Sequence, residues 1–234
     1  MQKLRHIGVI LDGNRRYAKN KGIVSFKGHE AGAEKIKDFL KWCDELGIEE
    51  VTMYALSIQN LNRTKEEVTY LFKLFEKFSE ELLKKKNIEE MKKKGIKIRF
   101  IGRKQLLPLK LQDLMKEVEE KTNDNGNKTI NFAIAYGGRE EITDSVKKIA
   151  EKIKKNEINI EDIDENLISE MLYLNSEPEL IIRTGGTTRT SNFLIWQSNY
   201  SEWFFLEKFW PEIEKEDLVK IIDKFHDTER RFGK

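Results

Sequence analysis

Residues that build disulfide bonds and zinc sites are scarce in this sequence. Its 234 residues include one cysteine, Cys43, and three histidines, His6, His29 and His226, which lie far apart. One cysteine excludes an internal disulfide, which fits a reducing compartment, and histidines at this spacing do not form a metal-ligand pattern. A formal net charge of +2 also excludes the strong positive field of a non-specific nucleic-acid binder, so any anion site must be local.

Long apolar segments and common nucleotide-binding motifs are absent too. No apolar run reaches the roughly 18 residues of a transmembrane helix, and the first residues, MQKLRHIGVILDG, carry charges where a signal peptide would be apolar. We therefore expect a cytoplasmic protein without a membrane-spanning segment. The sequence also lacks G-x-x-x-x-G-K-[ST], and no G-x-G-x-x-G follows the first apolar run, so neither a P-loop nor a Rossmann dinucleotide site is predicted.

The sequence does contain two kinds of segment in regular alternation. Short apolar runs typical of strands buried on both faces lie at 6–12, 51–57, 96–102, 129–136 and 179–184, with a candidate sixth at 202–206. Amphipathic segments expected to be helices lie at Ala33–Leu46, Thr64–Lys86, Leu109–Thr122, Glu140–Lys155 and Glu216–Phe232. The pattern predicts an α/β fold with a central, mostly parallel six-stranded sheet flanked by helices. Because no linker-like segment divides the chain, residues 1–234 are expected to form a single domain.

Glycines, small polar residues and arginines follow four of the predicted strands. The segments are DGNRR after the first strand, SIQNLNR after the second, GGRE after the fourth and RTGGTTRTSN after the fifth. The carboxyl ends of parallel strands lie at one edge of a sheet, and backbone N–H and guanidinium groups bind phosphate oxygens there. Together the four segments predict a pocket that holds more negative charge than one phosphate. The alternative for any single segment is a turn whose arginines pair with nearby glutamates.

Asp12 ends the first apolar run and directly precedes glycine, asparagine and two arginines. Phosphates repel a carboxylate unless a cation lies between them, and Mg²⁺ binds through one or two carboxylates together with water and phosphate oxygens. Asp12 is therefore a candidate Mg²⁺ ligand. The alternative is that Asp12 caps the helix that follows it.

Six blocks of the sequence carry a resemblance to a known family. They are HIGVILDGNRRYAKNKG (6–22), GHEAGAEK (28–35), YALSIQNLNRTKEEV (54–68), NFAIAYGGREEI (131–142), IIRTGGTTRTSNFLIWQSNYSEWFF (181–205) with WPEI (210–213), and ERRFG (229–233). In order and spacing they resemble the cis-prenyltransferases, the family of undecaprenyl diphosphate synthase and dehydrodolichyl diphosphate synthase. The resemblance spans nearly the whole chain, and it implies a single catalytic domain with a non-Rossmann fold and an apolar tunnel for the growing product.

The resemblance also implies roles for individual residues. Asp12 matches an aspartate that holds Mg²⁺ on the allylic diphosphate, Asn60 matches a residue that takes part in proton removal, and Glu202 matches a second Mg²⁺-associated carboxylate. Positions matching contacts to the allylic diphosphate are Gly13, Asn14, Arg15, Arg16, His29 and Arg63, and those matching contacts to isopentenyl diphosphate are Arg183, Arg189 and Ser191. Further substrate-binding positions match Tyr17, Ser57, Ile58, Gln59, Leu61 and Thr190.

The implied reaction is a Mg²⁺-dependent condensation of isopentenyl diphosphate with an allylic prenyl diphosphate. It releases diphosphate and gives a Z-polyprenyl diphosphate, the precursor of a lipid carrier. Arginines, N–H groups and Mg²⁺ would stabilise the charge that grows on the leaving oxygens. Synthases of the trans type carry D-D-x-x-D motifs, and this sequence has none.

The resemblance implies partners as well. Arg231 and Gly233 match a terminal R-x-G that reaches isopentenyl diphosphate across a dimer interface, so a homodimer is expected. A long apolar product implies transient membrane contact at its release by a protein that is otherwise cytoplasmic. No nucleic-acid partner is expected.

Two other classes of function stay open at this point. A non-catalytic subunit would keep the fold, but it would be expected to lose Asp12 or the residues that follow, and DGNRR is intact. An RNA-binding module would need basic and aromatic side chains alternating along a strand, and no such strand is evident.

The segment that begins at Thr64 has a predicted capping box, Thr64 with Glu67, followed by apolar residues at helical spacing. These are Val68, Leu71, Phe72, Phe75, Phe78 and Leu82. Such a stripe is typical of ordinary core packing, and the resemblance makes part of it a tunnel wall instead.

The sequence departs from better-known bacterial relatives at five positions. Where those relatives commonly have glycine, a basic residue, phenylalanine, tryptophan and glutamate, this chain has Arg15, Ser25, Leu56, Leu61 and Thr187, respectively. Leu61 removes a stacking surface near the allylic substrate, which bears on the choice of starter. Lys27 is a candidate replacement for the base missing at Ser25.

Overall fold

Six parallel strands form one sheet in the computed structural model, which describes residues 3–227. The strands are β1 (His6–Ile10), β2 (Glu50–Ser57), β3 (Ile96–Ile101), β4 (Lys128–Tyr136), β5 (Leu180–Arg183) and β6 (Glu202–Phe205). Their order across the sheet is β3-β4-β2-β1-β5-β6, and each neighbouring pair is parallel. The six predicted strands are confirmed, and the sheet, predicted to be mostly parallel, is parallel throughout.

The described residues also contain eight α-helices. They are α1 (Asn14–Asn20), α2 (Ser25–Glu45), α3 (Lys65–Leu82), α4 (Lys85–Lys94), α5 (Leu109–Thr122), α6 (Gly138–Lys154), α7 (Glu165–Met171) and α8 (Lys215–Asp227). The five predicted helices are present, whereas α1, α4 and α7 were not predicted as separate elements. The end predicted for the last helix, Phe232, lies outside the described residues.

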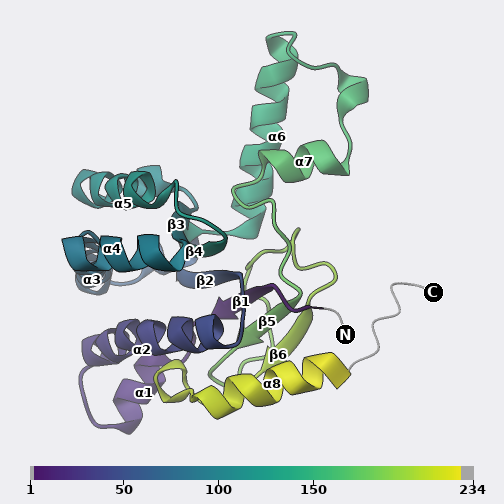
Figure 1. Ribbon diagram of the computed structural model, residues 1–234. Helices are drawn as coiled ribbons and strands as arrows, with labels where there is room; N and C mark the ends of the chain where they lie inside the picture. Colours follow the sequence, from purple (N-terminus) through teal and green to yellow (C-terminus); the bar gives the residue numbers. More distant parts are fainter. Residues whose placement is uncertain (1–2, 228–234) are drawn as a thin grey trace.

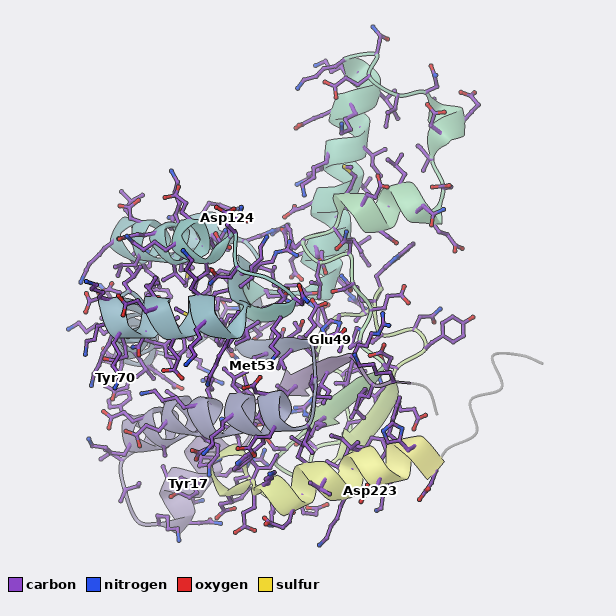
Figure 2. The ribbon with its side chains drawn as sticks, viewed as in Figure 1. Tyr17, Glu49, Met53, Tyr70, Asp124 and Asp223 are labelled. Atoms are coloured by element: carbon purple, nitrogen blue, oxygen red, sulfur yellow. The ribbon has the colours of Figure 1, made fainter. Side chains whose placement is uncertain are left out.

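Alternate residues of each strand enter two different apolar clusters, because successive side chains point to opposite faces of a sheet. Ile7 and Val9 of β1 and Met53 of β2 join a large cluster with residues of α2, α3, α4, α5 and α8. Figure 2 labels Met53 in this central part of the molecule. On the other face, Ile10 and Tyr54 pack in a smaller cluster with the segments that follow α7 and β5. Figure 1 shows α6 and α7 projecting away from the rest of the molecule.

The strand order places a crevice beside β1. From β1 the chain passes through α1 and α2 to β2 on one side, and β5 lies on the other side of β1. Ligands of parallel α/β proteins bind outside the carboxyl ends of the strands at such a switch point. The order also differs from the Rossmann order, as expected. Asp12 follows β1 and Arg183 ends β5, so both lie at this point.

Close packing of α2 against the start of α1 depends on Gly28. A Cβ atom at this position would lie 2.1 Å from the carbonyl oxygen of Asn14, so any other residue would force the two helices apart. The glycine in the GHEAG block therefore brings its neighbour His29 to the crevice.

The described part of the chain, residues 3–227, has no helix with the length and apolar character needed to cross a bilayer.

Candidate functional site

A cavity of about 1220 Å³ opens at the carboxyl ends of β1, β2 and β5. Thirteen of the residues that the sequence singles out as site residues line it. They are Asp12, Gly13, Asn14, Arg15, Arg16, His29, Ser57, Gln59, Asn60, Arg63, Arg183, Arg189 and Ser191. Segments far apart in the sequence are thus brought to one place, as the parallel sheet predicted.

Three of the four predicted loops form this cavity, and the fourth supports it from outside. The predicted single pocket of four loops is therefore wrong for GGRE: none of its residues is among those lining the cavity. Instead, the backbone N–H of Gly138 donates to the carbonyl oxygen of Asn192 at 2.8 Å, and that of Arg139 donates to the Asn192 side chain at 2.9 Å. The first turn of α6, which follows β4, thereby holds Asn192 in the loop after β5.

Several other predicted site residues lie outside the cavity wall. Tyr17, on α1 (Figure 2), is half-buried and does not line it. Ile58, Leu61 and Thr190 are not among the lining residues either, and Leu61 packs against the large apolar cluster. Arg231 and Gly233 lie outside the described residues.

Glu202 lies at the opposite end of the sheet from Asp12. It begins β6 and pairs in register with Leu180, at the amino end of β5, whereas Arg183 at the carboxyl end contacts Asp12. Within one chain, the two carboxylates therefore do not meet. A metal role for Glu202 stays a prediction and does not include sharing an ion with Asp12 of the same chain.

Asp12 lies between two guanidinium groups. Its Oδ2 accepts a hydrogen bond from Arg183 at 2.8 Å, and its Oδ1 accepts from Arg16 at 3.1 Å and from the backbone N–H of Gly13 at 2.6 Å. Burial opposes ionisation of Asp12, but these bonds and charges, led by those of Arg183, outweigh it and lower the pKa of the carboxyl group. Asp12 is therefore an anion at neutral pH.

The helix after Asp12 is not capped by it. The N-cap of α1 is Gly13, with φ 103° and no side-chain bond, a left-handed conformation that glycine adopts without strain. The alternative interpretation of Asp12 as a helix cap is therefore wrong. Its carboxylate, which is 29% exposed, faces the cavity and the cations.

Arg183 also shapes the loop after β5. This buried guanidinium donates to the carbonyl oxygen of Arg189 and, at 2.7 Å, to the hydroxyl of Ser191. Ser191 and Asn192 have φ values of 51° and 63°, so the loop turns sharply here. The result is that the exposed side chain of Arg189 is carried on a backbone that Arg183 fixes.

Ser57 and Asn60 form a reciprocal capping box at the start of η1 (Ile58–Asn62). The Asn60 N–H donates to the Ser57 hydroxyl at 3.2 Å, and the Asn60 side-chain oxygen accepts from the Ser57 N–H at 3.3 Å. Both residues line the cavity. An asparagine here thus has a local structural reason as well as any role in proton removal.

A second cluster surrounds Glu67 on α3. Arg63 donates to its Oε1 at 2.8 Å, Nε2 of His29 lies 3.4 Å from the same oxygen, and Arg15 lies 3.8 Å from Oε2. The three basic side chains line the cavity, but Glu67 does not. Burial and the nearby Arg63 lower the pKa of His29, although Glu67 acts in the opposite sense; the imidazole is therefore neutral at pH 7.

The structure also adds residues to the predicted set. Lys19, Tyr54 and Asn192 line the cavity, as do the aliphatic side chains of Ile23 and Val24. Lys19 lies one helical turn after Arg15, so the two share a face of α1; this spacing is visible in the sequence only once α1 is recognised as a helix.

Lys27 does not replace the base that is missing at Ser25. Its ammonium group pairs with Glu30 at 2.7 Å and is exposed, and Lys27 is absent from the cavity wall, whereas Ser25 and Arg15 both line it. Of these residues, Arg15 is the one that supplies a positive charge on that side.

The residues around Asp12 fit a Mg²⁺ ion whose ligands come partly from the protein and partly from a substrate. Among the residues described, no group of three or more histidine, cysteine, aspartate or glutamate side chains could hold a metal, and Asp12 is the one acidic residue in the cavity lining. Mg²⁺ binds through one or two carboxylates and completes its octahedron with water and phosphate oxygens. A single ionised carboxylate among phosphate-binding arginines meets this requirement.

Comparisons with known proteins agree with this geometry. A family described as "Putative undecaprenyl diphosphate synthase" matches residues 10–233. A tritrans,polycis-undecaprenyl-diphosphate synthase (geranylgeranyl-diphosphate specific) of Methanocaldococcus jannaschii is 46% identical over 98% of this chain and 82% of its own length. A protein of the same name from Pyrococcus abyssi is 44% identical over 98% of this chain and 87% of its own.

Solved structures show the same fold. Lavandulyl diphosphate synthase from Lavandula x intermedia, crystallised with dimethylallyl diphosphate, superimposes with a TM-score of 0.89 at 33% identity and covers 98% of both chains. A probable undecaprenyl diphosphate synthase from Campylobacter jejuni gives 0.82 at 30% identity and covers 100% of both chains. The chain therefore belongs to the cis-prenyltransferase family, that of undecaprenyl diphosphate synthase, and is an enzyme that transfers prenyl groups in prenyl diphosphate synthesis.

Proposed function

We propose that this protein elongates geranylgeranyl diphosphate with isopentenyl diphosphate units, in the presence of Mg²⁺, to a long Z-polyprenyl diphosphate that serves as a lipid carrier precursor. The observation that carries the proposal is the ionised Asp12 held between Arg16 and Arg183 in a cavity lined by further arginines. The choice of starter rests on the names of the relatives from Methanocaldococcus jannaschii and Pyrococcus abyssi.

The side chains of the cavity divide the work of binding two diphosphates. The allylic diphosphate is bound by Arg15 and Arg16 of α1, His29 of α2 and Arg63, which follows η1, and the loop after β5 presents Arg189 to isopentenyl diphosphate. Guanidinium groups aimed at the leaving oxygens stabilise the negative charge that develops as the allylic C–O bond breaks. A Mg²⁺ ion held by Asp12 would supply additional positive charge to stabilise the leaving diphosphate.

Asp12 must exchange partners for this chemistry. Without a ligand, its oxygens accept from Arg16 and Arg183. Diphosphate oxygens compete for those guanidinium groups, which leaves the carboxylate available to a cation. Asn60, held by Ser57, is proposed to support loss of a proton from the former isopentenyl unit of the cationic intermediate after the new bond forms.

A small apolar cavity of about 30 Å³ supports a path for the growing chain beside the large cavity. Aromatic side chains of α3 and the sheet, Phe75, Phe78 and Phe132, line it, and Ala55 lines both this cavity and the large one. Since its volume is far below that of the large cavity, the growing chain must displace side chains between α2 and α3. We propose this path as the apolar tunnel.

We further propose that two copies of the chain form the active homodimer, with Arg231 and Gly233 of each completing the partner's isopentenyl diphosphate site. The product combines a long apolar tail with a charged head, so the enzyme is proposed to act in the cytoplasm and to contact the membrane only at release.

One assay tests the proposed function. Purified protein is incubated with Mg²⁺, labelled isopentenyl diphosphate and, in turn, dimethylallyl, geranyl, farnesyl or geranylgeranyl diphosphate, and the products are resolved by length. We expect long Z-products, formed fastest from geranylgeranyl diphosphate. Absence of product with every starter would support a non-catalytic subunit, and products of only a few units would refute the long chain.

A further inference from the structure

Glu67 is a largely buried carboxylate directly behind the wall of the catalytic cavity. Its side chain is 12% exposed, and it is not among the residues that line the cavity. A buried charge is costly unless it is paired. Neither the metal site nor the second diphosphate site accounts for its presence.

Helix capping does not account for the Glu67 side chain either. The sequence predicts a capping box in which Thr64 and Glu67 bond reciprocally. In the structure the Thr64 hydroxyl accepts from the Glu67 N–H at 3.3 Å, which is half of that box. The carboxylate bonds instead to Arg63, so capping needs the backbone of residue 67 but not its acid.

The contacts of Glu67 join four elements around the cavity. Arg63 follows η1 and donates to Oε1 at 2.8 Å, His29 comes from α2, and Arg15 comes from α1. Arg63 is 28% exposed, so one side of its guanidinium group faces Glu67 while the group still reaches the cavity. The planar fork of arginine has five N–H donors, and those that Glu67 does not use remain for a ligand.

His29 places a second cavity-lining side chain against the carboxylate of Glu67. Its side chain is 10% exposed. Nε2 is buried and, among the described residues, has no hydrogen-bond partner, although it lies 3.4 Å from Glu67. The imidazole and the guanidinium group of Arg63 therefore approach the same Glu67 oxygen at the cavity wall.

We propose that Glu67 is a positioning residue for the allylic substrate: by holding the guanidinium group of Arg63 beside Nε2 of His29, it fixes the orientation in which Arg63 binds the allylic diphosphate. This inference rests on the proposed function. Glu67 does not touch the substrate, and its effect passes through Arg63.

A role in orientation depends on the length of the side chain at position 67 more than on its charge. Glutamine has the same reach as glutamate, and its carbonyl oxygen can accept the bond from Arg63. Aspartate and asparagine are shorter by one methylene, so their oxygens fall short of Arg63. Glutamate, glutamine, aspartate and asparagine at position 67 therefore vary the length and the charge of the side chain separately. Asparagine gives the short side chain without leaving an unpaired buried charge.

The experiment measures the Kd of geranylgeranyl diphosphate by titration calorimetry, without Mg²⁺ or isopentenyl diphosphate. It compares the wild type with Glu67→Gln, Glu67→Asp and Glu67→Asn, each also in an Arg63→Ala background. Fixing a side chain on binding costs about 0.5–1.5 kcal/mol, so we expect both short variants to weaken binding about three- to tenfold. Glu67→Gln should change the Kd less than about twofold, since it keeps the acceptor.

In the Arg63→Ala background, the substitutions at position 67 should have no further effect on the Kd, because coupled residues are non-additive. Glu66→Asp is the matched control on the exposed side of the same turn, and it should bind as the wild type does. Thermal melting establishes that each variant is folded at the temperature of the titration.

Three results would overturn the positioning role. They are a larger loss for Glu67→Gln than for Glu67→Asp, a loss for the short variants that persists without Arg63, and equal Kd values for all folded variants. The proposed function fails separately, when the wild type neither binds nor elongates geranylgeranyl diphosphate.

Discussion

Each end of the central strand β1 carries a polar network, and the two networks differ in charge and in access to ligands. At the carboxyl end, Asp12 pairs with Arg16 and Arg183 in a large cavity. At the amino end, Nε2 of His6 lies 2.8 Å from the Thr52 hydroxyl. There His6 and Thr52 are fully or almost fully buried, and neither lines a described cavity.

The amino-end network crosses three neighbouring strands. Asn131 of β4 donates to Thr52 of β2 at 3.0 Å and to Glu50 at 2.6 Å, and Ser176 donates to the same Glu50 oxygen at 2.7 Å. These hydrogen bonds link β1, β2 and β4 and help to fix their register. At the carboxyl end, a ligand can compete for the same kinds of group. The comparison therefore predicts that substitutions at the carboxyl end of β1 change turnover, whereas substitutions at the amino end change stability.

The largest expected effect is that of Asp12→Asn on turnover. Asparagine keeps an oxygen for Arg183 but removes the negative charge that attracts Mg²⁺, so kcat should fall by about 10³-fold, while the melting temperature stays within about 3 °C of the wild type. Steady-state assays with geranylgeranyl and isopentenyl diphosphate measure the first, and thermal melting measures the second. A near-normal kcat would show that Asp12 has no essential role in the reaction. A large loss of stability would contradict the proposed difference between the two ends of β1.

A smaller effect is expected for Arg189→Ala, because it removes one charged donor and leaves the metal ligand in place. Hydrogen bonds to charged groups contribute about 1.5–3 kcal/mol, so the KM for isopentenyl diphosphate should rise about 10- to 100-fold. The KM for the allylic substrate should change less than about threefold. Thr188→Ala, an exposed change in the same loop outside the cavity wall, is the control. Equal increases in both KM values would contradict the assignment of Arg189 to a separate isopentenyl diphosphate site.

At the amino end, Asn131→Ala should reduce stability without affecting turnover. It removes one buried and one partly buried hydrogen bond and leaves Thr52 and Glu50 without this donor, which costs about 1–3 kcal/mol in the free energy of unfolding. For a chain of this size that corresponds to a fall of about 2–12 °C in melting temperature. Asn123→Ala, at an exposed position, controls for loss of an asparagine. A fall in kcat with an unchanged melting temperature would contradict the division of roles.

The sheet and much of the site could be predicted from sequence, because both depend on local patterns. Apolar runs such as HIGVI identify strands buried on both faces, and residues that follow such runs must meet at one edge, as Asp12 and Arg183 do. The short helices α1, α4 and α7 are not predicted as separate elements, and this has a physical reason. Helix α1 has one buried residue, Ala18, in its seven positions, so tertiary contacts and not its own periodicity define it.

Glu67 could not be predicted as part of the site because its sequence context has a sufficient local explanation in the capping box. Its carboxylate turns towards Arg63 only because α1, α2 and η1 bring three basic side chains to it. Conversely, Glu202 stands in a matching block but at the other end of the sheet. Sequence places a residue in an element, whereas the direction and depth of its side chain depend on distant segments.

The smallest expected effect is a difference in pH dependence between the two ends, each of which has one buried histidine. Burial lowers the pKa of His6 although Glu50 and Glu179 oppose this, and burial and Arg63 lower the pKa of His29. Below the usual histidine pKa of about 6.5, the unfolded chain takes up protons that the folded chain does not. Stability from both residues is therefore present above pH 6.5 and is lost as the pH falls towards their folded-state values.

Urea unfolding at pH 7.5, 6.5 and 5.5 measures this loss for the wild type, His6→Gln and His29→Gln. One histidine contributes at most about 1.4 kcal/mol per pH unit, so each variant should lose about 1 kcal/mol less than the wild type between pH 6.5 and 5.5. Saturating inorganic pyrophosphate should separate the two ends. An anion bound beside His29 favours its protonated form and raises its pKa, so the share of the loss due to His29 should shrink while that due to His6 persists. If pyrophosphate removes the His6 share as well, the two ends of β1 are coupled and the comparison fails.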